Sequence, residues 1–360
     1  MLVYNRRRYN FSLVLLRLLD KNDNFTTDLK PLNGKIMRPV GYLITLCLFL
    51  SCCASSLMSQ QTVNLNDRPF DLHTPSGDIK GKLLTPGMGE GYPVVLLIAG
   101  SGPTDMDGNS SQMGLNPNSL KLLAQGLSEK GIASVRFDKR GVASSAASGK
   151  EEYLLRFDDY INDVRLWIDK LAGDRRFSGI YVLGHSEGAL IGMLACKDNP
   201  KVKGYISMAG AGRPLYEVIE SQLAAQPEVI KDMVKGINDS LKVGKLQPNV
   251  PLGLQALFRP SVQPYLISCY KYNPSEIIGT LTMPVLILQG KTDIQVTITD
   301  AGLLRKAAPK ADYYLIDNMN HVLKTCTTTE QQAQAVTYTN PLLPVNAYML
   351  LLIEKFVKKP

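Results

Sequence analysis

Short, wholly apolar runs that alternate with helical segments constrain the fold of this chain more than any other feature. The run Val94–Ile98 contains no polar residue, as expected of a strand that is buried on both faces of a sheet. Further strands are predicted at Phe70–His73, Ile79–Leu84, Ala133–Phe137, Ile180–Leu183, Gly204–Met208, Val285–Leu288 and Tyr313–Ile316. Helices are predicted over residues 117–130, Glu151–Leu171, Glu187–Cys196 and Asn346–Val357. The alternation predicts an α/β fold with a mostly parallel central sheet flanked by helices, which binds ligands at the carboxyl ends of its strands.

One long segment interrupts this alternation. The strands predicted to end at Met208 and to start at Val285 are separated by more residues than an ordinary connection contains. The intervening pattern is mostly helical and is broken by several prolines. We interpret residues 211–278 as a helical cap that is inserted over the active edge of the sheet. The alternative is a surface excursion that is unrelated to the site.

Residues 1–56 carry a different pattern, which predicts a leader. The apolar run Val40–Leu50 has about the length of a signal-peptide core and is shorter than the ~20 residues that a membrane-spanning helix needs. Lys35 and Arg38 supply a positive flank, and small residues follow the run. Met37 is the predicted true start of the protein. A genuine N-terminal extension with an uncleaved anchor is the alternative.

The end of this leader allows two kinds of processing. The segment Leu50-Ser51-Cys52-Cys53 resembles a bacterial lipoprotein box, in which lipidation of the cysteine would attach the protein to a membrane. Ordinary cleavage after Ser56 fits equally well. Both outcomes predict an exported protein, either periplasmic, membrane-anchored or secreted, whose hydrolase domain spans residues 57–360.

Composition excludes few partners but argues against a nucleic acid. The formal charge is +8, but residues 1–56 hold eight Lys or Arg and three Asp, a net of +5, which leaves +3 for the rest. No basic stripe with interleaved aromatic residues is present, so we expect solvated surface lysines.

Three cysteines follow the leader: Cys196, Cys269 and Cys326. An odd number cannot form a complete set of disulfides, and one disulfide between two of them stays open.

The strongest chemical signal is Gly-x-Ser-x-Gly at residues 184–188, which follows a predicted strand and begins a predicted helix. This strand–turn–helix context is the one in which the motif presents a nucleophilic serine. The flanking glycines allow the strand and the helix to cross closely. A serine hydroxyl is a weak nucleophile, so Ser186 requires a base that removes its proton.

The base can be chosen from three histidines. His73 lies on an early strand outside the core sheet, and His185 adjoins the serine with its side chain expected to point away from the hydroxyl. His321 follows the last predicted strand and is the predicted base. Asp293, just after the strand Val285–Leu288, is the predicted acid that orients His321. Its rivals are Asp300, expected within the next helix, and Asp317, four residues before the histidine.

An oxyanion hole needs backbone N–H groups that point at the developing negative charge. One is predicted from Glu187, at the start of the helix after the nucleophile. The loop at residues 99–108 follows the strand Val94–Ile98 and contains Gly100 and Gly102, which permit a tight turn with exposed N–H groups. A glycine-rich loop can also cradle phosphate, but the lysine and the spacing of a phosphate loop are missing. The second donor is therefore assigned to Ser101.

Together these motifs resemble the α/β-hydrolase superfamily over about residues 62–357, and within it bacterial carboxylesterases and serine-aminopeptidase-like hydrolases. The resemblance rests on the Ser, Asp, His chain order, on the loop Gly100–Gly108 and on Phe137-Asp138-Lys139-Arg140-Gly141. The chain departs from the family at Ala99, where many relatives have His, and at Ala143, where a Gly often stands.

The resemblance implies a serine hydrolase that cleaves carboxylic esters through an acyl-enzyme intermediate, without a metal or an organic cofactor. The expected substrate is a small-molecule ester. The alternative is a peptidase that acts on short peptides, with a carboxylate such as Glu217, Glu220 or Glu228 holding the free amine. An acyltransferase and a non-catalytic binding relative are further alternatives. The sequence leaves acyl specificity and oligomeric state open.

Overall fold

The computed structural model describes residues 66–359, and the predicted leader lies outside this range. Its centre is an eight-stranded sheet with the order β1-β4-β6-β5-β7-β8-β9-β10. In this order, the strands β6, β5, β7, β8, β9 and β10 run parallel to one another. Strand β4 is antiparallel to both of its neighbours, β6 and β1. The strands are β1 (Asn66–Pro69), β4 (Gly81–Thr85), β5 (Tyr92–Ile98), β6 (Ala133–Phe137), β7 (Phe177–His185), β8 (Val202–Met208), β9 (Val285–Gly290) and β10 (Asp312–Ile316). The predicted mostly parallel sheet is thus confirmed.

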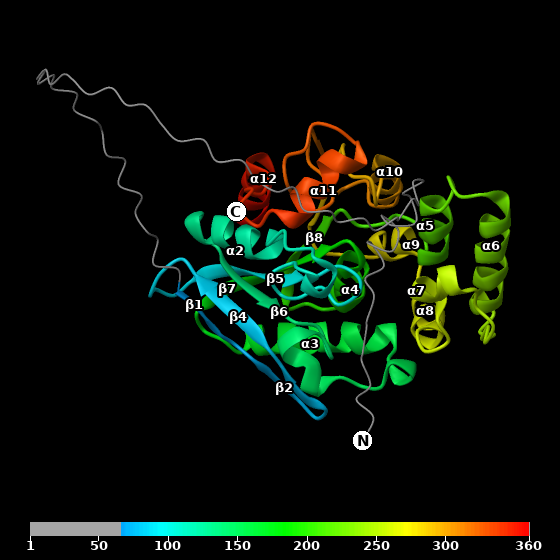
Figure 1. The fold of residues 1–360 in the computed structure, drawn as a ribbon. Helices are drawn as coiled ribbons and strands as arrows, with labels where there is room; N and C mark the ends of the chain where they lie inside the picture. Colours follow the sequence, from blue (N-terminus) through cyan, green and yellow to red (C-terminus); the bar gives the residue numbers. More distant parts are fainter. Residues whose placement is uncertain (1–65, 360) are drawn as a thin grey trace, which may run out of the picture. The chain divides into compact units, whose positions relative to one another are not determined.

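Helices cover both faces of this sheet (Figure 1). One apolar layer joins the sheet to α3 and α4, and the other joins it to α2 and α12. The alternation along β5 shows this directly, because Val94, Leu96 and Ile98 belong to the first layer while Val95 and Leu97 belong to the second. The helices are α2 (Ser119–Glu129), α3 (Phe157–Ala172), α4 (Glu187–Cys196), α10 (Ile298–Ala307), α11 (Gln331–Thr339) and α12 (Ala347–Val357). Burial on both faces explains why the strand sequences are apolar throughout.

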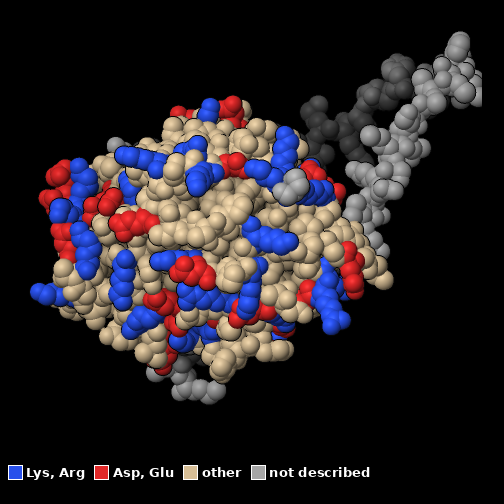
Figure 2. Space-filling view, turned by 180° about the vertical axis from the view of Figure 1, so that it is seen from behind, with Lys and Arg blue, Asp and Glu red and all other residues tan. Residues whose placement is uncertain are grey.

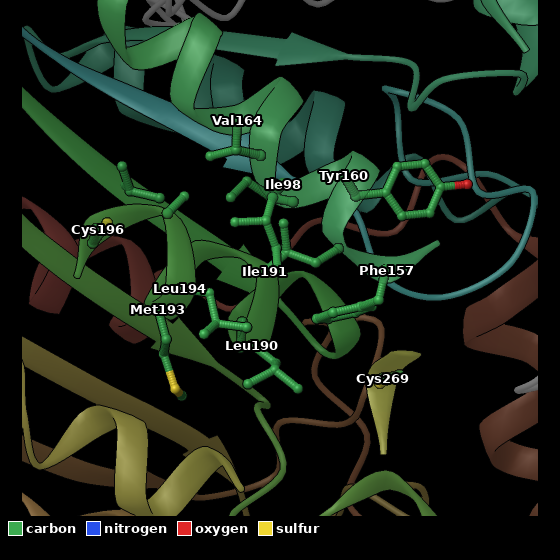
Figure 3. Packing of buried hydrophobic residues seen from close by; sticks show 14 of the residues in the cluster. Ile98, Phe157, Tyr160, Val164, Leu190, Ile191, Met193, Leu194, Cys196 and Cys269 are labelled. Atoms are coloured by element: carbon green, nitrogen blue, oxygen red, sulfur yellow. The ribbon is translucent and has the colours of Figure 1, made fainter. Parts of the chain in front are cut away.

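Helix α4 lies at the centre of the first layer. Every residue from Gly188 to Cys196 is buried, and Figure 3 shows Ile191 beside Ile98 of β5. Burial raises the pKa of the Cys196 thiol. Cys269 and Cys326 are buried as well, and all three cysteines of the described chain are free thiols.

The segment predicted as a cap contains five helices and one 3₁₀ turn between β8 and β9. They are α5 (Leu215–Gln222), α6 (Glu228–Lys242), η4 (Leu252–Leu254), α7 (Gln255–Phe258), α8 (Gln263–Cys269) and α9 (Pro274–Ile278). Helix α8 packs against α3, and α9 packs against α4 and α10. In Figure 1 α5 to α8 form a group at one side of the sheet. The insertion is therefore anchored on the helices that flank the nucleophile motif.

Two predicted strands differ from the structure. The predicted strand Ile79–Leu84 is divided at Lys80, because β3 (Gly77–Ile79) pairs with β2 (Leu72–Thr74) in a separate hairpin while β4 pairs in the main sheet. The Lys80 amide donates instead to the Ser145 hydroxyl, 2.8 Å away. The predicted strand Phe70–His73 overlaps only with β2, because β1 ends at Pro69 and the two residues after it belong to neither strand.

The helix expected from Glu151 begins six residues later, and α11 was not expected at all. Residues Glu152–Leu154 form a 3₁₀ turn, and the Asp159 carboxylate accepts a hydrogen bond from the Arg156 amide, 2.9 Å away, at the start of α3. This capping contact sets the first turn of the helix.

Within residues 66–359, none of the helices combines the length and the apolar character that crossing a bilayer requires. On the face drawn in Figure 2, acidic and basic side chains are interspersed.

Candidate active site

Ser186 stands at the sharp turn between β7 and α4, where it has φ +56° and ψ −121°. A positive φ is costly for a residue with a side chain, so surrounding contacts must hold the turn. The Ser186 amide donates to the Met208 carbonyl oxygen of β8 at 2.9 Å, and its own carbonyl accepts from the Ala189 amide at 2.9 Å. The sheet and the helix thus fix the serine backbone from both sides.

The two glycines of the motif are required by the close crossing of β7 and α4. A Cβ atom on Gly184 would lie 2.1 Å from the Gly188 carbonyl oxygen. A Cβ atom on Gly188 would lie 2.5 Å from the carbonyl oxygen of Ile98. Both obstacles are backbone atoms, so neither can move aside. This geometry supplies the physical reason for the spacing of the motif.

The structure brings Asp293 and His321 together. Asp293 follows β9 and His321 follows β10, and the Nδ1 atom of His321 lies 2.8 Å from Oδ2 of Asp293. The two side chains are 0% and 4% exposed, so solvent does not screen the contact. Because Nδ1 is engaged by the carboxylate, Nε2 is the ring nitrogen left for another partner. His321 and Ser186 line the same pocket of about 50 Å³.

The Asp293 carboxylate is held by three donors besides the histidine. Its Oδ1 accepts from the amides of Gln295 and Val296 at 2.8 and 3.0 Å, and its Oδ2 accepts from the Gln289 side chain at 3.1 Å. Hydrogen bonds of this kind fix the orientation of a carboxylate. Asp293 therefore presents Oδ2 to the histidine in one defined position.

The two rival acids lie elsewhere. Asp300 is buried in α10 and forms a two-pronged pair with Arg213, with N–O distances of 2.9 and 2.8 Å. Asp317 has a side chain that is 75% exposed and pairs with Lys291. Neither carboxylate contacts His321 through a hydrogen bond in the described part of the chain. Asp293 is thus the acid that the fold positions next to this histidine.

The other two histidines have different partners. His73 is exposed in the β2–β3 hairpin and bonds to Asp78 at 2.7 Å. His185 is buried, and its Nε2–H donates to the His321 carbonyl oxygen at 2.8 Å, with the two rings 4.9 Å apart. Burial lowers the pKa of His185 to about 3, and the neighbouring His321 acts in the same direction. A neutral His185 therefore supports the backbone of the histidine loop.

The glycine-rich loop after β5 lies against the serine. A Cβ atom on Gly100 would be only 3.2 Å from Cβ of Ser186, so the loop backbone approaches the nucleophile motif closely. Ser101 lines both pockets beside Ser186, and Glu187 lines the larger one. The Thr104 hydroxyl donates to the Ser101 carbonyl oxygen at 2.9 Å and holds the turn. The two residues predicted as oxyanion donors thus flank the serine.

Residues after β6 support this loop. The buried Asp138 carboxylate accepts from the Met106 amide at 2.6 Å and from the Ser144 amide at 2.8 Å, so it ties the two loops together. Burial raises the pKa of Asp138. Ala143, which stands where relatives often have Gly, adopts φ +42°, a conformation that favours glycine.

The larger pocket, of about 150 Å³, lies between Ser186 and the inserted helices. Most of its lining side chains are apolar, among them Leu155, Leu190, Leu215, Val218 and Leu266. Its charged residues lie in ion pairs: Arg259 bonds to Glu152 at 2.8 Å, Arg213 pairs with Asp300, and Lys139 lies 3.5 Å from Oε1 of Glu187, which accepts no hydrogen bond in the described part of the chain. Glu217, Glu220 and Glu228, the predicted candidates for holding an amine, do not line either pocket. Among residues 66–359, no three His, Cys, Asp or Glu side chains are grouped so that they could hold a metal ion.

The parallel sheet, the strained serine turn and the acid–histidine pair after the last two strands are arranged as in the α/β-hydrolase fold, and the comparisons support the α/β-hydrolase superfamily for this chain. Residues 116–250 match a family model described as serine aminopeptidase, S33. The chain is 29% identical to esterase EstD of Thermotoga maritima over 252 residues, which cover 68% of this chain and 58% of that esterase. The chain thus spans little more than half the length of this curated relative.

Solved structures show the same fold. Est1E from Butyrivibrio proteoclasticus matches with a TM-score of 0.52 and 18% identity, over 79% of this chain and 98% of that protein. An esterase from Pyrococcus furiosus matches with a TM-score of 0.50 and 15% identity, over 76% of this chain and 90% of that protein. At these identities the likeness establishes the fold alone.

Proposed function

We propose that this protein is a serine hydrolase that cleaves carboxylic esters, with Ser186 as nucleophile, His321 as base and Asp293 as the acid that orients the base. The single observation that carries the proposal is the buried Asp293–His321 hydrogen bond of 2.8 Å beside a pocket that Ser186 also lines. An α/β-hydrolase with this arrangement has the parts that acyl transfer needs. The esterase EstD relative supports the choice of ester substrates.

In the proposed mechanism, Nε2 of His321 takes the proton of the Ser186 hydroxyl while Oγ attacks the ester carbonyl carbon. The carbonyl electron pair moves to the oxygen, which the amides of Ser101 and Glu187 stabilise. As the tetrahedral intermediate collapses, the carbon–oxygen bond to the alcohol breaks and the alcohol leaves with the proton from His321. Water then repeats the attack on the acyl-enzyme, with His321 as base, and releases the acid.

We further propose that residues 211–278 act as a cap over the site and select the substrate. Residues of α5, α7 and α8 line the larger pocket together with Ser186. Because this lining is mostly apolar and its charges are paired, the proposed substrate carries an apolar group on that side of the ester. The smaller pocket, of about 50 Å³, would take the group on the other side.

The test is hydrolysis of p-nitrophenyl acetate and butyrate by the wild-type protein and by Ser186→Ala. We expect clear turnover that the Ser186→Ala variant loses. Absence of turnover by well-folded wild-type protein would rule out a simple esterase.

A serine peptidase is the second candidate, because residues 116–250 match the serine aminopeptidase model. An aminopeptidase must hold a free amine, and the carboxylates that line the pocket are Glu152 and Glu187, paired with Arg259 and Lys139. This pairing favours ester substrates over substrates that carry a free amine. Hydrolysis of aminoacyl p-nitroanilides at rates above those of the esters would reverse the preference.

We also propose that the protein is exported and that its leader ends in a lipidated cysteine or a simple cleavage site. The support is the pattern of residues 37–56, which lies outside the described structure. Expression of the full chain in a bacterial host with radiolabelled palmitate tests the two forms. Label that Cys53→Ala and Cys52→Ala together remove would indicate lipidation, while a shortened, unlabelled exported protein would indicate simple cleavage.

A further inference from the structure

A buried lysine lies directly behind the glycine-rich loop. The Lys139 side chain is 2% exposed, and its Nζ lies 2.5 Å from the Gly100 carbonyl oxygen. The ammonium group is 3.5 Å from Oε1 of Glu187 and 5.2 Å from the centre of the Tyr160 ring. Burial lowers the pKa of this ammonium group. A buried cation with one carboxylate at 3.5 Å contributes little to stability, so its position invites a functional explanation.

The carbonyl that Lys139 contacts belongs to the same peptide group as the Ser101 amide. The peptide is trans, so its C=O and N–H bonds point in opposite directions. A hydrogen bond accepted by the oxygen fixes the plane of the peptide and polarises it, which makes the N–H a stronger donor. Lys139 therefore acts on the Ser101 N–H from the far side of the peptide group.

The same ammonium group also reaches the second predicted donor. Its ion-pair partner is the side chain of Glu187, whose backbone N–H begins α4 beside Ser186. One cation thus contacts the peptide group that carries the Ser101 amide and the side chain of the residue that carries the other predicted donor. Gly100, which the lysine contacts, lies against Ser186, because a Cβ atom on this glycine would be only 3.2 Å from Cβ of Ser186.

We infer that Lys139 is a positioning residue of the oxyanion hole: it orients and polarises the Gly100–Ser101 peptide and holds Glu187 in register with it. This inference rests on the proposed serine-hydrolase function. Lys139 does not touch the reacting atoms in this scheme. Its effect should therefore appear in the stabilisation of the transition state and not in the binding of the substrate.

The test compares ester hydrolysis by the full-length wild type, Lys139→Met, Lys139→Arg and a control, Lys170→Met. Lys170 makes contacts of the same type, to the Asp71 carbonyl oxygen and over the Phe70 ring at 4.5 Å, but does not line either pocket. We expect Lys139→Met to lower kcat about tenfold or more with little change in KM, which is less than the ~10²–10³-fold loss from deleting an oxyanion donor. Lys139→Arg should keep most of kcat, and Lys170→Met should keep all of it.

A second readout separates this role from a structural one. Sulfur is a weak hydrogen-bond acceptor, so a thionoester gains less from the oxyanion hole than the matching ester. Lys139→Met should therefore lose ester turnover more than thionoester turnover, and the preference of the wild type for the ester should narrow. A general structural defect would lower both rates equally.

Several outcomes overturn the inference. These are an unchanged kcat for Lys139→Met, an equal loss with ester and thionoester, or a higher KM at constant kcat, which would assign Lys139 to substrate binding. If Lys139→Met does not fold, Lys139→Gln carries the same expectations and the same refuting results. A wild type without any Ser186-dependent turnover defeats the proposed function itself, whereas an active wild type with an equally active Lys139→Met defeats only the role of the lysine.

Discussion

Replacing Asp293 by Asn tests the proposed acid–base pair most directly. The carboxylate accepts from His321 and Gln289 on Oδ2 and from two backbone amides on Oδ1. If the new amide keeps its oxygen toward the two backbone donors, its NH₂ group faces Nδ1 of His321. The histidine must then accept at Nδ1 and carry its proton on Nε2, the nitrogen that should take the serine proton. We expect kcat to fall about 10⁴-fold, or ~5.5 kcal/mol in the activation free energy.

The fold should survive this change, since the cavity keeps its size and one donor–donor conflict costs about 1–3 kcal/mol. Initial rates with p-nitrophenyl butyrate measure kcat, and urea denaturation measures the free energy of unfolding. Asp317→Asn is the matched control, because Asp317 is largely exposed and pairs with Lys291. The reasoning is refuted if Asp293→Asn retains a tenth of the wild-type kcat, or if Asp317→Asn loses activity instead.

Three further predictions concern the supports of the site. Gly188→Ala should lower the free energy of unfolding by more than ~3 kcal/mol in urea denaturation, because the new Cβ atom would lie 2.5 Å from the Ile98 carbonyl oxygen. Gly236→Ala is the control: its Cβ atom would point into open space, so the free energy of unfolding should rise by up to ~1 kcal/mol. Ala143→Gly should raise it by about 0.5–1 kcal/mol by relieving φ +42°, and a lower value would contradict the strain argument. Since burial lowers the pKa of His185 to about 3, only the unfolded chain binds this proton between pH 6.5 and 3. Stability from this group is complete above pH 6.5 and is lost as the pH falls to 3, on the order of 5 kcal/mol in all. His185→Gln should flatten that decline in unfolding curves measured at several pH values, and an unaltered slope would assign the decline to other groups.

The boundaries of helices and strands could not be predicted from the sequence pattern alone. Apolar periodicity predicted α3 from Glu151, but the capping contact between Arg156 and Asp159 starts it at Phe157. The strand predicted through Lys80 is divided because its two halves pair in different sheets. Pairing partners are distant in the chain, so a local pattern cannot reveal such a division.

The candidate site was predictable wherever it follows from the order of strands and turns. Ser186, Asp293 and His321 are predicted because each follows a predicted strand of the parallel sheet, and such strands end at one edge of a sheet. The structure places Asp293 beside His321 for that reason. In the sequence, Lys139 stands out only as part of a segment that resembles a family signature. Its signal was a lysine directly after a buried strand, but only the fold shows that it reaches Gly100 and Glu187.

The sequence by itself determined the sheet, its helical layers and the turn that carries Ser186, because hydrophobic periodicity and glycine spacing act over a few residues. Tertiary structure alone decided which charges became paired, which acidic residues stayed out of the pocket and how the inserted helices line it. These properties depend on contacts between segments far apart in the chain, such as Arg213 with Asp300 and Arg259 with Glu152. Local patterns specify which elements form, whereas the packing of those elements determines the electrostatics of the site they enclose.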